Sequence, residues 1–168
     1  MTVVDFYQKK YGLHVQLNQV RATVGALHAM YLVMQVLLDP GDEVIIHEPY
    51  FSPYREQVVL SGGKPVFVPT YEENGFQLDV EDLKAAITDR TKAIIINSPN
   101  NPTGAVFSEN TLKQIAEVAI EKELFIISDE IYEDFAFKEN SYPWLVWLQK
   151  TPSLSAVYRR ALRWRVGA

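Results

Sequence analysis

The sequence predicts an α/β protein of three layers (αβα), in which helices cover both faces of a mostly parallel sheet. Two observations lead to this fold class. Short runs rich in β-branched residues alternate along the chain with stretches that carry helix start and stop signals. The runs are also continuously apolar, as is typical of strands buried on both faces. Ligands of such sheets bind in the crevice at the carboxyl ends of the strands.

Four strands are expected, and each is closed by Pro, Asn or Asp, which end strands readily. They are EVIIHEP, KPVFVP, KAIIIN and LFIISD, at residues 43–49, 64–69, 92–97 and 124–129. The third run leads into SPNNPTG, where Pro99 and Pro102 are expected to stiffen a polar corner. A rigid corner at a strand end is well placed to present a side chain to a ligand.

Helices are expected between these strands. Residues 24–43 form a stretch that is apolar nearly all round and stops at an Asp-Pro-Gly turn, so we expect a buried helix there. Residues 52–63 end in two glycines, residues 79–87 begin with acidic side chains, and residues 108–123 begin with Ser108 as a candidate N-cap. This alternation favours right-handed βαβ units and hence a parallel sheet.

The last quarter of the chain differs from the rest. Residues 138–168 carry all three tryptophans, and neither a helical nor a strand period runs through them. No internal repeat and no low-complexity linker indicates a second domain there.

Composition and charge limit the kinds of molecule that the protein is expected to bind. The formal charge is -5 with no basic patch, which disfavours nucleic acid. The chain has no cysteine, its three histidines lack metal-ligand spacing, and no apolar run is long enough to cross a bilayer. We expect a cytoplasmic protein without a metal site.

Several residues that could carry chemistry follow the expected strands. Phe51, Asn101, Asp129 and Tyr132 come after strands, and Gly25 opens the first helix, so all should project into one crevice. Asp129 ends a strongly apolar strand, where an ionised carboxylate is costly without a cation or several donors. The sequence leaves two interpretations open, a ligand cation or a cap on the next helix.

Three motifs in colinear order carry a family resemblance. They are ATVGALHAMYLVMQVLLDPGDEVIIHEPYFSPY, NSPNNPTG and SDEIYEDF. Together they resemble the large domain of class I/II aminotransferases, the fold-type-I enzymes that use pyridoxal 5′-phosphate (PLP), over roughly residues 1 to 140. The resemblance implies a partial PLP-binding large domain at residues 1–142, followed by an altered or degenerate segment, 143–168, that ends in a family-like WRVG. It also implies amino transfer between an amino acid and a 2-oxo acid, and a homodimeric parent protein.

The resemblance also implies roles for single residues. Asp129 matches the carboxylate that keeps the pyridine nitrogen protonated, and Asn101 and Tyr132 match the two groups that hydrogen-bond the phenolic oxygen. Phe51 matches the aromatic side chain that stacks on the ring.

The phosphate group has its own matches. Gly25, Ala26 and Leu27 match the phosphate-binding turn, and Arg165 matches the phosphate-binding arginine. Leu27 departs from the small polar residue often found there, so a hydroxyl contact would be lost while the backbone donors stay.

One family residue is missing. The family forms its Schiff base through a lysine, but an alignment on Ser153 and Ser155 places Ala156 there, and an alignment on Trp164 and Arg165 places Val157 there. Neither side chain forms an imine. The resemblance therefore implies no catalytic residue, an inactive chain and, at most, noncovalent PLP.

Several alternatives stay open. A shifted reading frame, a replacement or a relaxed homologue would each explain the altered segment. A PLP-dependent β-lyase, or a non-catalytic aminotransferase-like ligand-sensing module, fits the same scaffold. Because the chain resembles a fragment, we also expect it to aggregate or to need a partner.

Overall fold

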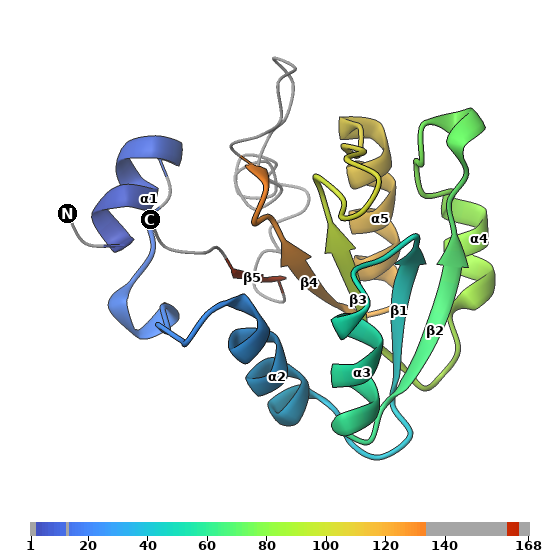
Figure 1. The fold of residues 1–168 in the computed structure, drawn as a ribbon, viewed down its shortest axis with the longest axis horizontal. Coiled ribbons are helices and arrows are strands. Elements are labelled where there is room, and N and C mark those ends of the chain that lie inside the picture. Colours follow the sequence, from blue (N-terminus) through green and yellow to red (C-terminus); the bar gives the residue numbers. More distant parts are fainter. Residues whose placement is uncertain (1–2, 13, 134–160, 165–168) are drawn as a thin grey trace.

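A computed structural model describes residues 3–12 and 14–133, together with the backbone of 161–164. Its centre is one sheet in which five parallel strands are ordered β2-β1-β3-β4-β5 (Figure 1). The strands are β1 (Glu43–Glu48), β2 (Lys64–Pro69), β3 (Thr91–Asn97), β4 (Phe125–Asp129) and β5 (Ala161–Trp164). The parallel sheet predicted from the apolar runs is confirmed.

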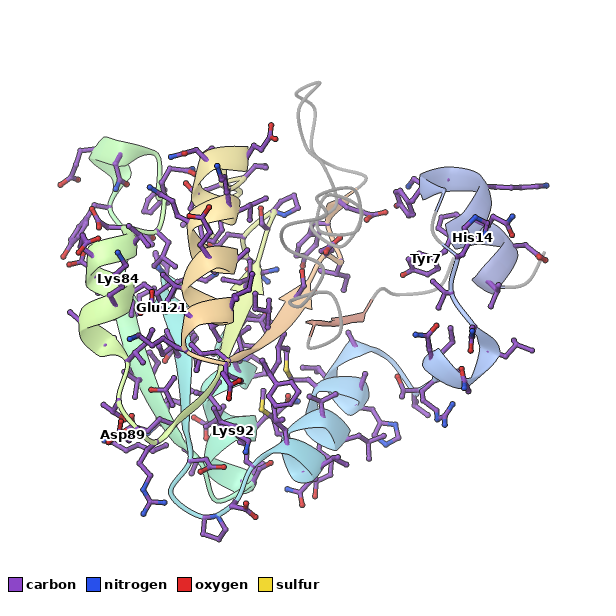
Figure 2. All side chains as sticks on the ribbon, turned by 180° about the vertical axis from the view of Figure 1, so that it is seen from behind. Tyr7, His14, Lys84, Asp89, Lys92 and Glu121 are labelled. Atoms are coloured by element: carbon purple, nitrogen blue, oxygen red, sulfur yellow. The ribbon has the colours of Figure 1, made fainter. Side chains whose placement is uncertain are left out.

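Helices lie on both faces of this sheet. The described α-helices are α1 (Val3–Tyr11), α2 (Ala26–Leu37), α3 (Pro53–Leu60), α4 (Val80–Ala86) and α5 (Glu109–Glu121). Helices α2 and α3 lie in front of the sheet in Figure 1, whereas α4 and α5 lie in front in Figure 2, which is seen from behind. The three-layer arrangement expected from the sequence is therefore confirmed.

Two hydrophobic cores fill the space between the layers. Successive residues of β3 point to opposite faces, so Ile94 and Ile96 belong to one core and Ala93 and Ile95 to the other. The side chains that α2 and α3 contribute to their core are Met30, Met34, Tyr54 and Val58, and those from α4 and α5 include Leu83, Leu112 and Ile115. Strands β1, β3 and β4 are thus buried on both faces, as predicted.

The edge strand β2 departs from that prediction. Three of its six residues are half-buried, two are exposed, and only Val68 is fully buried. The reason is its place in the sheet, because β2 pairs with β1 alone among the described strands.

Helix α2 also departs from its prediction. Met30 and Met34 are buried, but Tyr31, Leu32 and Val36 are 41%, 43% and 89% exposed. The expectation that this helix is buried all round was wrong, because among the described residues the sheet and α3 cover one face of it. The helix also ends at Leu37, before the Asp-Pro-Gly turn.

Among the described α-helices and strands, two were not predicted. Helix α1 has two β-branched residues at its start, which weaken a helical pattern. Strand β5 has four residues, too few to show a period, yet its backbone pairs with β4 from Ile126↔Ala161 to Asp129↔Trp164. The other three helices lie where the sequence predicts them, and the predicted cap of α5 is confirmed: the Oγ of Ser108 accepts a hydrogen bond from the Thr111 backbone N–H at 3.1 Å.

Candidate functional site

A cavity of about 300 Å³ opens at the carboxyl ends of β3 and β4 and the N-terminus of α2. Its wall contains seven of the residues predicted for the site: Gly25, Ala26, Leu27, Phe51, Asn101, Asp129 and Tyr132. Because these residues come from four separate segments of the chain, their convergence is a property of the fold. The volume lies at the lower end of the range for small-molecule sites.

The N-terminus of α2 forms one end of the cavity. Gly25 is its N-cap with φ of 83°, a conformation that other residues adopt at a cost, and a Cβ there would meet no atom within 4 Å. The first backbone N–H groups of a helix lack partners within the helix and carry its positive dipole end. This end of the cavity is therefore suited to an anion such as a phosphate.

Neighbouring side chains fix this turn. The Oγ1 of Thr23 donates to the carbonyl of Gly25 at 2.9 Å, and the Nδ1 of His28 accepts from the backbone N–H of Val24 at 3.3 Å. From α3, the Nε2 of Gln57 donates to the carbonyl of Leu27 at 2.9 Å. Helices α2 and α3 are thus tied together beside the cavity.

Asp129 lies at the end of β4 and is 6% exposed. Its Oδ2 accepts a hydrogen bond from the Tyr54 hydroxyl at 2.7 Å, and its Oδ1 accepts from the backbone N–H of Ile131 at 3.2 Å. Burial, followed by the charge of Asp129, raises the pKa of Tyr54, so this hydroxyl stays protonated and serves as a donor. These two donors offset the cost of burying the ionised carboxylate, for which the sequence predicts a cation or several donors.

Asn97 connects the polar corner to Asp129. It is 1% exposed; its Oδ1 accepts from the Asn101 backbone N–H at 2.8 Å, and its Nδ2 donates to the Asp129 carbonyl at 3.1 Å. The backbone N–H of Asn97 donates to the Nε2 of His47 at 3.3 Å. One buried amide therefore fixes the distance between two residues of the cavity wall.

The other residues of the corner form hydrogen bonds with one another and with the segment that follows β1. The Oδ1 of Asn100 accepts from the backbone N–H and the hydroxyl of Thr103 at 3.1 and 2.7 Å, and its Nδ2 donates to the Pro49 carbonyl at 3.2 Å. The side-chain amide of Asn101 has no hydrogen bond within the described part of the chain, and it borders the cavity. That amide is available to a ligand.

His47, on β1, lies behind this corner. Burial lowers its pKa to about 4, and its ring lies 5.1 Å from that of Phe107. The neutral ring keeps Nε2 as an acceptor for Asn97. His47 therefore supports the corner and does not reach the cavity wall.

Sequence reasoning missed Tyr54 and Asn97 as wall residues. Tyr54 lies three positions after Phe51, and Asn97 ends a strand, so both positions carried a usable signal. Arg165 and the two candidate lysine positions, Ala156 and Val157, lie outside the described residues. Within the described ranges, no cluster of three His, Asp or Glu side chains could hold a metal, and no helix is long and apolar enough to span a membrane.

Fold and cavity together define an α/β protein with a candidate small-molecule site at the carboxyl end of a parallel sheet, bounded by the N-terminus of α2 and a buried carboxylate. A family profile, aminotransferase class I and II, matches residues 2–158. The chain belongs to this family, whose members depend on PLP.

Individual relatives agree with this assignment. The chain is 46% identical to an aspartate aminotransferase of Bacillus subtilis over 81% of its own length and 35% of the relative's. It is 49% identical to a probable aspartate/prephenate aminotransferase of Aquifex aeolicus, over 74% of its length and 32% of the relative's. The chain therefore spans about a third of the length of these relatives.

Solved structures show the same fold. An aspartate aminotransferase from Thermus thermophilus with maleate superposes with a TM-score of 0.87 at 36% identity, over 99% of this chain and 41% of that one. An alanine aminotransferase from Pyrococcus furiosus gives a TM-score of 0.82 at 39% identity, over 86% and 37% of the two chains. The fold predicted from the family resemblance is confirmed.

Proposed function

We propose that this chain binds PLP noncovalently in the cavity at the carboxyl ends of the strands, and that it does not complete amino transfer by itself. One observation carries the proposal. Seven residues that the family resemblance assigns to the cofactor line a single cavity, although they are spread from Gly25 to Tyr132 along the chain.

The residues present fit the polar and flat parts of the cofactor. Asp129 would face the ring nitrogen, the amide of Asn101 and the hydroxyl of Tyr132 would hydrogen-bond the phenolic oxygen, and Phe51 would stack on the ring. Bound PLP supplies an electron-poor ring that accepts electron density from the α-carbon of an amino acid. The protein's part is to hold this ring in one orientation.

The phosphate would lie at the N-terminus of α2. Backbone N–H groups of Ala26 and Leu27 would bind it, so the apolar side chain of Leu27 does not prevent the contact. We also assign Arg165 to the phosphate, on the strength of the sequence match alone. This end of the cavity is where the φ of 83° at Gly25 allows the backbone its close approach.

The chain lacks the amine that a transaminase requires. Ala156 or Val157 stands where the family has its lysine, and neither side chain holds or moves a proton. Without that group, the cofactor has no covalent link to the protein and no residue to carry the proton between substrate and cofactor. We therefore expect binding without turnover.

The named relatives favour amino transfer over the two alternatives, a β-lyase and a ligand-sensing module, because all of them are aminotransferases. By family, the parent reaction takes an amino acid and a 2-oxo acid.

We further propose that the protein forms homodimers, which the exposed apolar side chains Tyr31, Leu32 and Val36 on α2 support. A cytoplasmic location, expected from the cysteine-free sequence, also stays a proposal.

The test is a titration with PLP, followed by dialysis and by reduction with borohydride. We expect a saturable absorbance change that dialysis reverses. Asp129→Ala should weaken affinity between about 10-fold and 100-fold, because a charge-assisted hydrogen bond is lost. The matched control is Asp82→Ala, which removes an exposed carboxylate on α4 and should leave affinity unchanged.

Two results would contradict the proposal. If the absorbance of the wild-type chain did not change on addition of PLP, the proposed binding of PLP would be wrong. Lys150 is the lysine nearest in sequence to Ala156 and Val157. A stoichiometric pyridoxyl group on it, found by mass spectrometry after reduction and digestion, would show that another amine has replaced the missing lysine and that binding is covalent.

A further inference from the structure

Asp129 is held by a side chain from a distant part of the chain. Tyr54 is on the first turn of α3, 75 positions earlier in the chain, and its hydroxyl donates to Oδ2 of Asp129 at 2.7 Å. Its ring packs edge-on against that of Phe51, with centroids 5.7 Å apart and an interplanar angle of 82°. Tyr54 is only 2% exposed. This buried wall residue therefore contacts two other residues of the cavity wall.

This hydrogen bond favours the ionised form of Asp129. A donor to a carboxylate stabilises the charged state, and Tyr54 is a permanent donor because burial and the neighbouring charge raise the pKa of its hydroxyl. Since Oδ1 accepts from the Ile131 backbone at 3.2 Å, the two hydrogen bonds together fix the plane of the carboxylate. A fixed plane decides where its remaining lone pairs point.

We propose that Tyr54 is a positioning residue, which keeps the Asp129 carboxylate ionised and oriented toward the ring nitrogen of the cofactor. The identity of the cofactor rests on the proposed function, whereas the action of Tyr54 on Asp129 does not. Tyr54 acts through Asp129 and has no proton to give up at ordinary pH. The hydroxyl, and not the aromatic ring, carries this role.

Other titratable groups surround Asp129 and enter any dependence on pH. Among the described residues they are Tyr132 on the cavity wall, the buried Glu130 beside it in the chain, and His47 on β1, which reaches it through Asn97. All of them are retained when the Tyr54 hydroxyl is removed. A comparison of Tyr54→Phe with the wild type therefore isolates one hydrogen bond.

The first arm of the experiment needs no cofactor. The full chain is labelled with ¹³C at the aspartate carboxyls, and the Asp129 signal is followed by NMR against pH. In Tyr54→Phe we expect its midpoint to rise by about one pH unit, the size typical of a hydrogen bond to a charged group. Tyr50→Phe is the matched control, because it removes a hydroxyl from the same segment, where the ring of Tyr50 stacks on that of Phe67. It should leave the midpoint unchanged.

The second arm measures PLP affinity by absorbance from pH 8 down to pH 5. Tyr54→Phe should bind about tenfold more weakly at the acid end, with the decline beginning at a higher pH than in the wild type or Tyr50→Phe. A merely structural role would weaken binding equally at every pH.

Several outcomes would overturn the role of Tyr54. They are an unchanged Asp129 midpoint, a loss of affinity that is the same at all pH values, and an unfolded Tyr54→Phe chain beside a folded Tyr50→Phe chain. If the wild type does not bind PLP at all, the proposed function fails, and the carboxyl titration still decides whether Tyr54 controls Asp129.

Discussion

The two ends of the parallel sheet both bury a carboxylate, but they surround it differently. At the amino ends, Glu43 on β1 accepts from the Nζ of Lys64 at 2.8 Å and from the Thr88 hydroxyl at 2.6 Å. At the carboxyl ends, Asp129 accepts from Tyr54 and borders a cavity of about 300 Å³. A carboxylate enclosed by its partners stabilises the fold, whereas one beside a cavity is also available to a ligand.

Figure 2 makes the separation visible. Asp89 and Lys92, which flank the start of β3, lie at the end of the sheet where Glu43 is found, far along the strands from the cavity. Changes at the amino end should therefore alter the free energy of unfolding and leave ligand affinity alone. Changes at the carboxyl end should affect both.

The largest expected effect comes from His47, behind the cavity. Burial moves its pKa from the ordinary 6.5 to about 4, which corresponds to roughly 3 kcal/mol. Between these two values the unfolded chain binds a proton that the folded chain does not. The folded state should therefore be most stable above pH 6.5 and lose about that much free energy of unfolding as the pH falls to 4.

Urea unfolding at a series of pH values measures this loss. His47→Gln keeps an acceptor for the Asn97 N–H and should flatten the dependence. His14→Gln, which changes the exposed histidine labelled in Figure 2, should keep the wild-type dependence. If the free energy of unfolding fell equally steeply with pH in the wild type and in His47→Gln, His47 would not be the cause of the loss.

A smaller effect is expected at Gly63, where the chain enters β2 at the amino end. A Cβ there would lie 2.8 Å from the Cδ1 of Leu38 and 3.1 Å from the Cγ1 of Val58. Gly63→Ala should therefore lower the free energy of unfolding by about 2 kcal/mol through overpacking, without changing PLP affinity. Denaturant titration supplies the first value and absorbance the second.

A double-mutant cycle sharpens this test. In a Leu38→Ala background the closest atom is gone, so Gly63→Ala should cost clearly less there than in the wild type. Equal costs in both backgrounds would mean that crowding at Leu38 is not the cause.

The smallest effect is expected at Glu43. Its hydrogen bonds with Lys64 and then Thr88 lower the pKa of its carboxyl, so its contribution is present above the ordinary value of 4.5 and is lost as the pH falls through the lower folded value. Glu43→Gln should lower the free energy of unfolding by about 1 kcal/mol at pH 7. The difference from the wild type should shrink as the pH falls below 4.5.

The exposed pair Lys84 and Glu81 provides the contrast for Glu43. Glu81→Gln should produce no measurable change, because water screens exposed ion pairs. A larger loss for Glu81→Gln than for Glu43→Gln would contradict the distinction between enclosed and exposed carboxylates.

Much of the fold follows from local sequence patterns. Strands β1, β2 and β4 and helices α3, α4 and α5 lie within the segments predicted for them, since apolar runs and capping residues act over a few positions. The sequence pattern of α2 shows that its residues are apolar nearly all round, but it does not show whether another element packs against each face. That is why the exposed side of α2 was not foreseen.

The site divides in the same way. Asp129 and Asn101 could be predicted, because each follows an apolar strand and lies in a recognisable motif. The partners that hold them could not, because Tyr54 and Asp129 are 75 positions apart and only the packing of α3 on the sheet brings them together. The role of Asn97 likewise depends on β4 lying beside β3.

Because β5 comes late in the chain, the order in which the chain is synthesised affects when the site forms. Asp129 pairs with Asn97 on one side of β4 and with Trp164 on the other. On a ribosome, the first pairing becomes available long before the second, because residues 161–164 emerge well after β4 is complete. Until then, the strand that carries Asp129 has one side without its hydrogen-bonding neighbour. Among the described strands, β4 is thus the last to gain its second neighbour as the chain is made.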